Sequence, residues 1–132
     1  MDYNAPYYEV RNCTNDTLLI DLTYSDKLED EFYWGIHPED TIYLSPDYID
    51  TAYIQGEKML IRNDFCALPD STISGRCDIK TNTCYLYAIK WNIVKKYSYK
   101  EILDKKLYDR RVLTQKDFDS RYIYEYRYMN AN

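Results

Sequence analysis

TCYLYAIKW, residues 83–91, is the stretch that decides the fold. Its large side chains alternate between the two sides of an extended chain, as expected for a β-strand. One side carries Cys84, Leu86 and Ala88, with Lys90 at the end of the row. The other side carries Tyr85, Tyr87, Ile89 and Trp91. Both sides are apolar, so we expect this strand to be covered on both faces.

Shorter segments before this strand indicate a β-rich first half. Strands are predicted at YYEVRN (7–12), TLLIDLTYS (17–25), TIYL (41–44) and KMLIRN (58–63). In TLLIDLTYS, Leu18, Ile20 and Leu22 occupy every second position and therefore fall on one face of the strand. Residues 26–35 predict a loop that runs into a short edge strand, and residues 64–76 a loop. SPDYID (45–50) predicts one or two helical turns, because a serine cap precedes a proline at the first helical position.

The last third of the chain predicts one helix and a closing strand. Ser98 and Glu101 form a capping box, and an apolar stripe follows at helical spacing, which predicts a helix over about residues 98–108. Thr114 with Asp117 predicts a single further turn. RYIYEYRYM (121–129) is then expected to close the sheet beside residues 83–91. The intervening segment is long enough for those two strands to run parallel.

These elements together predict a mainly β domain of the α+β class, an antiparallel sandwich or barrel with that one helix. The 132 residues fit a single domain, with residues 1–6 as a loose tail. The composition is tyrosine-rich, with 17 tyrosines and only three glycines. The sequence contains neither GxGxxG nor GxxxxGK[ST], the two glycine-rich motifs that bind phosphate groups, so no nucleotide cofactor is expected. No other cofactor is expected either.

The charge is unevenly distributed along the chain. Residues 1–50 hold twelve acidic and two basic residues, whereas residues 95–132 hold ten basic and six acidic ones, within a net charge of −5. The acidic total argues against nucleic acid as a partner. The sequence has no apolar run of about 18 residues, so no membrane-spanning segment is expected.

Four cysteines, Cys13, Cys66, Cys77 and Cys84, are candidates for disulfide bonds. CDIKTNTC (77–84) is typical of a hairpin, in which pairing of Asp78 with Thr83 would place Cys77 opposite Cys84. A bridge from Cys66 to Cys77 is the competing local alternative. Either bridge implies an oxidising compartment, whereas four free thiols would suit the cytoplasm. The spacing does not favour a metal site, because zinc ligands usually occur in close pairs.

No catalytic motif is present, and two residue sets are candidate binding surfaces. The first is an aromatic row formed by Tyr122, Tyr124, Tyr126 and Tyr128, which we expect to pack against a layer of the fold. The second is a basic face formed by Lys95, Lys96, Lys100, Lys105, Lys106, Arg110 and Arg111. The lone His37 and the acidic clusters at residues 29–31 and 39–40 are expected to be solvated.

Several stretches also carry a resemblance. NCTNDTLLIDLTY, IHPEDTIYL, YLYAIKW and above all YSYKEILDKKLYDRRVLTQKDF (97–118) are similar to small proteins of gut bacteria that carry lipoprotein-type export signals. The similarity covers most of residues 7–128. It implies export, a β-rich domain and a lipid anchor on the full-length precursor. It implies no activity and no catalytic residues.

The expected function is therefore non-enzymatic binding of a protein or glycan in the bacterial periplasm or at the cell surface. One alternative is an immunity-type protein, cytoplasmic or periplasmic, whose acidic first half covers a basic partner. Another is a small hydrolase whose site the motifs do not reveal.

Overall fold

The computed structural model describes residues 7–28, 36–38, 48–54, 57–62, 65–78 and 83–128, and short strands dominate these segments. The elements are β1 Tyr7–Asn12, β2 Leu18–Thr23, β3 Ile36–Pro38, β4 Tyr48–Ile54, β5 Glu57–Arg62, β6 Cys66–Ala67, β7 Thr72–Asp78, β8 Thr83–Lys90, α1 Trp91–Lys96, α2 Tyr99–Asp104, β9 Asp109–Thr114, the 3-10 turn η2 Gln115–Asp117 and β10 Ile123–Tyr126. The predicted class, mainly β with a late helix and a closing strand, is confirmed.

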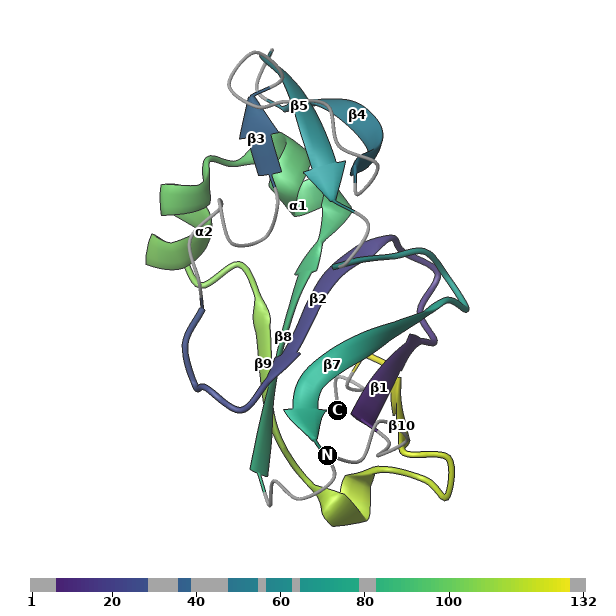
Figure 1. Cartoon of the computed structure of the whole chain (residues 1–132). Helices are drawn as coiled ribbons and strands as arrows, with labels where there is room; N and C mark the ends of the chain where they lie inside the picture. The colour runs from purple at the N-terminus through teal and green to yellow at the C-terminus, as the bar shows by residue number, and fades with distance from the viewer. Residues whose placement is uncertain are drawn as a thin grey trace.

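The strands form three open sheets. Their orders are β10-β1-β7, β6-β2-β8-β9 and β3-β5-β4. All neighbours run antiparallel except β1 and β10, which are parallel. No sheet closes on itself within the described segments, so the sandwich alternative is correct and the barrel is not. The third sheet lies at the end of the molecule next to α1 (Figure 1).

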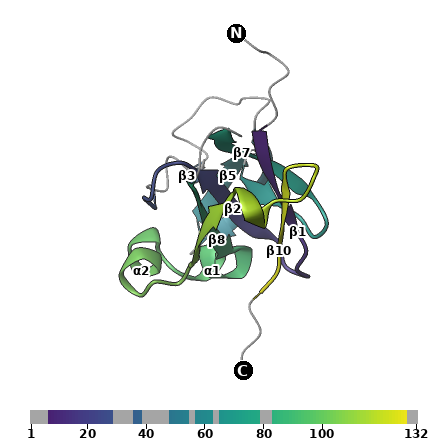
Figure 2. The same cartoon turned by 90° about the horizontal axis from the view of Figure 1, so that it is seen from below.

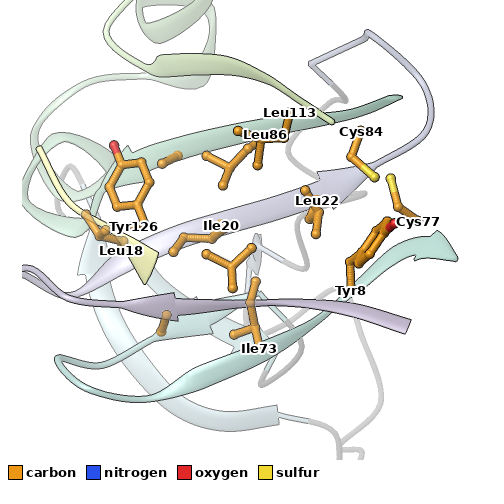
Figure 3. Packing of buried hydrophobic residues seen from close by; sticks show 13 residues of the cluster. Tyr8, Leu18, Ile20, Leu22, Ile73, Cys77, Cys84, Leu86, Leu113 and Tyr126 are labelled. Carbon is orange, nitrogen blue, oxygen red and sulfur yellow. The ribbon is translucent and has the colours of Figure 1, made fainter. Parts of the chain in front are cut away.

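The first two sheets pack face to face over the main core. Leu18, Ile20 and Leu22 of β2 are almost fully buried there, on the face that the sequence predicted. Burial of each such side chain contributes about 1.5–3 kcal/mol. Residues from β1, β6, β7, β8, β9 and β10 complete the cluster, and Figure 3 shows the labelled ones meeting between the sheets.

The opposite face of the four-stranded sheet is covered by the helices. Tyr87 and Ile89 of β8 pack there with Val94 of α1 and Ile102 of α2. Both faces of β8 are therefore covered, as the alternation in residues 83–91 predicted. Seen from below, the layers run from the helices through β8 and β2 to β1 and β10 (Figure 2).

The turn between β1 and β2 is organised by a buried asparagine. Asn12 is 0% exposed and its amide nitrogen donates to the backbone carbonyls of Asp16 and Ala67, at 2.8 and 2.9 Å. Its side-chain oxygen accepts from the backbone N–H and the hydroxyl of Thr14, at 3.0 and 2.7 Å. All four hydrogen bonds of the side chain are thus made, which is how a buried amide avoids a desolvation penalty.

The closing strand has a different neighbour from the one predicted. β10 pairs with β1, with Val10 opposite Tyr124, and not with β8. The two edges of β8 are already taken by β2 and by β9, which pairs through Leu86 and Arg111. The predicted parallel pairing thus exists, but with the first strand of the chain.

Several local predictions were wrong, and sheet pairing explains each. The short helix expected after residue 45 is strand β4, where Ala52 pairs with Met59 of β5. The loop predicted at 64–76 contains β6 and most of β7. The helix expected over 98–108 ends at Asp104, because residues 109–114 join β8 as strand β9. Tertiary pairing overrides a local cap signal when the two compete.

Other local predictions were correct or fall elsewhere. The capping box at Ser98 and Glu101 and the single turn after Thr114 are both present. Helix α1 was not predicted. The strand expected at 41–44 lies outside the described residues, as does most of the loop expected at 26–35.

Candidate ligand cavity

A cavity of about 490 Å³ opens beside the end of β8, where the turn after α2 meets the chain that follows β10. Its walls combine tyrosine rings, aliphatic side chains and charged groups. The lining residues are Leu18, Ala88, Lys90, Ile93, Lys106, Leu107, Tyr108, Asp109, Arg111, Tyr126 and Tyr128. Ligand sites of proteins usually have this size and this mixture of apolar wall and few polar groups.

One wall of the cavity is a fixed polar network around Asp109. The Asp109 Oδ2 atom accepts from Arg111 Nε at 2.9 Å and from the Tyr126 hydroxyl at 2.7 Å. Arg111 also donates to the Tyr124 hydroxyl and to the backbone carbonyl of Arg127, and its guanidinium lies 4.2 Å from the centre of the Tyr126 ring. Arg111 is therefore held in one position and its charge is matched by Asp109.

The hydroxyl of Tyr126 is committed to this network. Burial, followed by the hydrogen bond to Asp109, raises the pKa of Tyr126 well above its usual value. The group therefore stays protonated and acts as a donor to the carboxylate at neutral pH.

Two lysines in the cavity are differently placed, because neither Lys90 nor Lys106 has an ion-pair partner among the described residues. The ammonium of Lys90 lies 4.7 Å from the centre of the Tyr128 ring, in a cation–π contact. Tyr128 is itself positioned by a hydrogen bond from its hydroxyl to Asp16, at 2.6 Å. After Arg111 and Asp109 offset each other, these two lysines give the described lining of the cavity a positive charge.

The backbone of Lys106 is unusual for a lysine. Lys106 N donates to the Leu103 carbonyl and Leu107 N to the Ile102 carbonyl, which is the Schellman pattern that ends many helices. The residue at this position must adopt a left-handed backbone, and Lys106 has φ of 54°. Glycine usually occupies such a position because side chains are strained there.

The predicted aromatic row is divided by the structure. Tyr122 and Tyr124 are half-buried beside Phe118, whose ring stacks on Tyr8 at 4.0 Å. Tyr126 is buried, and Tyr128 is 39% exposed. Only the last two line the cavity, so the four rings do not form one continuous exposed platform.

The predicted basic face is also divided. Lys106 and Arg111 line the cavity, whereas Lys95 and Lys96 are exposed on α1. On α2, Lys100 pairs with Asp104 at 2.6 Å and Lys105 with Glu101 at 3.5 Å. The remaining member is Arg110.

Arg110 belongs to a separate polar cluster on the four-stranded sheet. Its guanidinium makes two hydrogen bonds with the carboxylate of Asp26, which also accepts from the Tyr87 hydroxyl. Arg110, followed by Tyr87, lowers the pKa of Asp26 to about 2. Burial and then the Asp26 contact raise the pKa of Tyr87 to about 12. The cluster ties the segment after β2 to strand β9.

None of the four cysteines forms a disulfide bond in this structure, but two of them are brought together. Cys77 of β7 and Cys84 of β8 are buried between the two sheets, and their sulfur atoms point toward each other (Figure 3). A hydrogen bond between them, followed by burial, raises the pKa of Cys77. The predicted hairpin is wrong, because β7 pairs with β1 while β8 pairs with β2 and β9.

The other two cysteines have different surroundings. Cys66 packs against the cluster under the helices, on the far face of the four-stranded sheet from Cys77. The Cys13 thiol donates to Glu125 at 3.6 Å. A bridge from Cys66 to Cys77 would therefore have to cross the sheet.

Other candidate groups give no further site. His37 is described only as part of strand β3, and the acidic residues 29–31 and 39–40 lie outside the described segments. In the segments that are described, no three histidine, cysteine or acidic side chains lie together in a way that could hold a metal ion. Neither described helix has the length and apolar character needed to cross a membrane.

Besides aliphatic residues, the cavity lining includes three charged or aromatic residues that were not in the predicted binding surfaces: Lys90, Tyr108 and Asp109. Lys90 carried a signal, because it is the one charged residue in the inward row of residues 83–91. Asp109 carried none, since its neighbours Arg110 and Arg111 made it look like part of a solvated helix.

Comparison with family models, with curated proteins and with solved structures finds no match to this chain. The function is therefore argued from the cavity itself.

Proposed function

We propose that this chain is an exported, β-rich binding domain of the bacterial periplasm or cell surface, and that it takes its ligand into the cavity beside β8. The observation that carries the proposal is the pair Lys90 and Lys106, two cations without carboxylate partners among the described residues, in a tyrosine-lined cavity. Charged groups in a ligand site are arranged to complement the ligand.

Binding without catalysis is part of the proposal. Asp109 and Tyr126 hydrogen-bond each other, and the raised pKa of Tyr126 makes it a poor base or nucleophile at neutral pH. Arg111 is fixed by three partners in the same network. These contacts suit a rigid binding wall better than groups that must exchange protons.

Export is supported by the buried cysteine pair and by the resemblance to exported proteins. We expect Cys77 and Cys84 to form a disulfide between the two sheets when the chain folds in an oxidising compartment. Such a bridge closes a short loop and would stabilise the fold by roughly 2–3 kcal/mol in the chain-entropy model. A lipid anchor on a longer precursor belongs to the same proposal.

The binding proposal is tested by a cavity-filling variant. A fragment collection is screened by NMR against the wild type and against Leu107→Trp, which places an indole in the cavity wall. Compounds that bind the wild type but no longer bind Leu107→Trp support the proposal. Val112→Trp, on an exposed side chain of β9 outside the cavity, is the control for a new surface tryptophan. Equal binding to both variants, or no binder at all, would contradict it.

The export proposal is tested by counting thiols in protein secreted into the periplasm of a bacterial host. Under denaturing conditions without reductant we expect two free thiols, those of Cys13 and Cys66. Mass spectrometry of a digest should then join the peptides of Cys77 and Cys84. Four free thiols in that protein would contradict the bridge.

A further inference from the structure

We infer that the cavity binds an acidic sugar, meaning a hydroxyl-bearing ring with a carboxylate or phosphate group. The inference rests on the proposed binding function and names the class of ligand. It follows from three properties of the cavity: a positive charge that no described carboxylate matches, a hydrogen-bond acceptor to which no described group donates, and a wall of rings and aliphatic groups.

The positive charge calls for an anionic group on the ligand. Lys90 and Lys106 are both exposed at the cavity, and neither is neutralised by a described carboxylate. Lysine is a flexible point charge that suits carboxylate and phosphate alike. The charge alone therefore does not distinguish a sugar acid from a simple anion.

The acceptor is the Oδ1 atom of Asp109, and it distinguishes a hydroxyl-bearing anion from a simple one. Both hydrogen bonds to this carboxylate use Oδ2, and no described group donates to Oδ1. Asp109 lines the cavity, and a carboxylate oxygen there accepts from a donor on the ligand. A hydroxyl-bearing anion offers such a donor, whereas a fully ionised carboxylate or phosphate without hydroxyl groups would instead meet repulsion there.

The wall supplies surfaces for the ring of the sugar. Tyr108 and Tyr128 are partly exposed at the cavity, next to Leu107 and Ile93. Aromatic and aliphatic groups pack against the C–H faces of a sugar ring while leaving its hydroxyls free for polar groups. A ligand that satisfies Lys90, Lys106 and Asp109 together thus carries charge, hydroxyls and an apolar face.

The backbone of Lys106 gives independent support. A lysine is held at φ of 54°, where glycine would be unstrained, and this lysine lines the cavity. Strained side-chain positions of this kind persist where the side chain has a role. Lys106→Gly should therefore stabilise the turn and weaken ligand binding, so that one substitution has opposite effects on stability and on affinity.

The test is isothermal titration of the full chain with five probes: glucuronate, glucose 6-phosphate, glucose, inorganic phosphate and benzoate. We expect the two acidic sugars to bind, and glucose, phosphate and benzoate to bind at least tenfold more weakly. Glucuronate alone would assign a carboxylate ligand, and glucose 6-phosphate alone a phosphorylated one; both results support the inference. Phosphate or benzoate binding as tightly as the acidic sugars would overturn it, because the hydroxyl groups of the sugar ring would then contribute nothing to binding. Glucose binding equally well would also overturn it.

Variants locate the effect in the cavity. Lys106→Gly should weaken acidic-sugar binding by roughly tenfold, the effect of losing one charge-assisted hydrogen bond, while its melting temperature rises. Lys116→Ala, an exposed lysine on η2 outside the cavity, should bind as the wild type does. Equal weakening by both lysine variants would overturn the inference. If no acidic sugar binds but other fragments still bind the cavity, the inference fails while the proposed function stands.

Discussion

Asn12→Ala tests how the two-sheet core is held together at its first turn. Asn12 makes four hydrogen bonds, all within 2.7–3.0 Å, to Thr14, Asp16 and Ala67. Ala67 is 0% exposed, so truncation leaves its carbonyl oxygen without this donor in the interior. The substitution therefore removes hydrogen bonds and at the same time leaves buried polar groups without a partner.

The size of the effect follows from those contacts. Each hydrogen bond contributes about 0.5–1.5 kcal/mol net, and a stranded buried group costs about 1–3 kcal/mol. Some of the groups can recover a water molecule at the edge of the turn, so we expect a loss of about 3–4 kcal/mol in the free energy of unfolding. That is a large part of the roughly 5–15 kcal/mol that holds a domain together.

Urea denaturation followed by tryptophan fluorescence measures this loss. A loss of that size should also lower the melting temperature by roughly 10–15 °C for a chain of this length. Asn15→Ala is the matched control, because Asn15 is exposed in the same turn and should change stability by less than about 0.5 kcal/mol. A loss below about 1 kcal/mol for Asn12→Ala, or equal losses for both variants, would refute the reasoning.

Three further predictions concern other parts of the fold. Gly75→Ala should destabilise the protein by about 1–3 kcal/mol in urea, because a Cβ at Gly75 would lie 2.6 Å from Leu22 Cδ2; Ser74→Ala on the exposed side is the control, and equal effects would contradict the prediction. Arg110 and Tyr87 lower the pKa of Asp26 to about 2, so the stabilisation that ionised Asp26 gives the fold is present above about pH 4 and is lost as the pH falls toward 2. Melting curves of Asp26→Asn should therefore show a smaller loss of stability between about pH 4 and pH 2 than the wild type shows. An identical loss in both proteins would contradict this. Lys106→Gly should raise the free energy of unfolding by about 0.5–1 kcal/mol, and a loss of stability would show that its positive φ is not strained.

The central sandwich could be predicted because its strands carry simple period-two patterns. Leu18, Ile20 and Leu22 needed only one buried face, and residues 83–91 needed two. The capping box at Ser98 is equally local, since its partner Glu101 is three residues away. Patterns of this kind depend on neighbours in the sequence and survive folding.

Strand partners could not be predicted in the same way. RYIYEYRYM was expected beside residues 83–91, but β9 occupies that edge. In β9 the side chains of Arg111 and Val112 gave no period-two apolar signal, since Val112 is exposed and Arg111 points toward Tyr124. The neighbour of the closing strand therefore depended on β9, a strand that the sequence pattern did not predict.

The cavity was still harder to foresee. Lys90, Lys106 and Tyr128 come from three separate segments, and only the fold brings them together. The left-handed turn at Lys106 lacks its usual glycine, so the end of α2 gave no signal. The cysteine pair shows the same limit, because Cys77 and Cys84 meet across the sandwich and not along a hairpin.

An NMR titration with glucuronate tests the central claim, that the cavity beside β8 is the ligand site, most directly. We predict saturable shifts of backbone amide signals at Lys90, at residues 106–109 and at residues 126–128, and clearly smaller shifts in Lys106→Gly at the same sub-saturating concentration, because its affinity should be roughly tenfold weaker. Shifts confined to the exposed lysines of α1, or equal shifts in the variant, would contradict it.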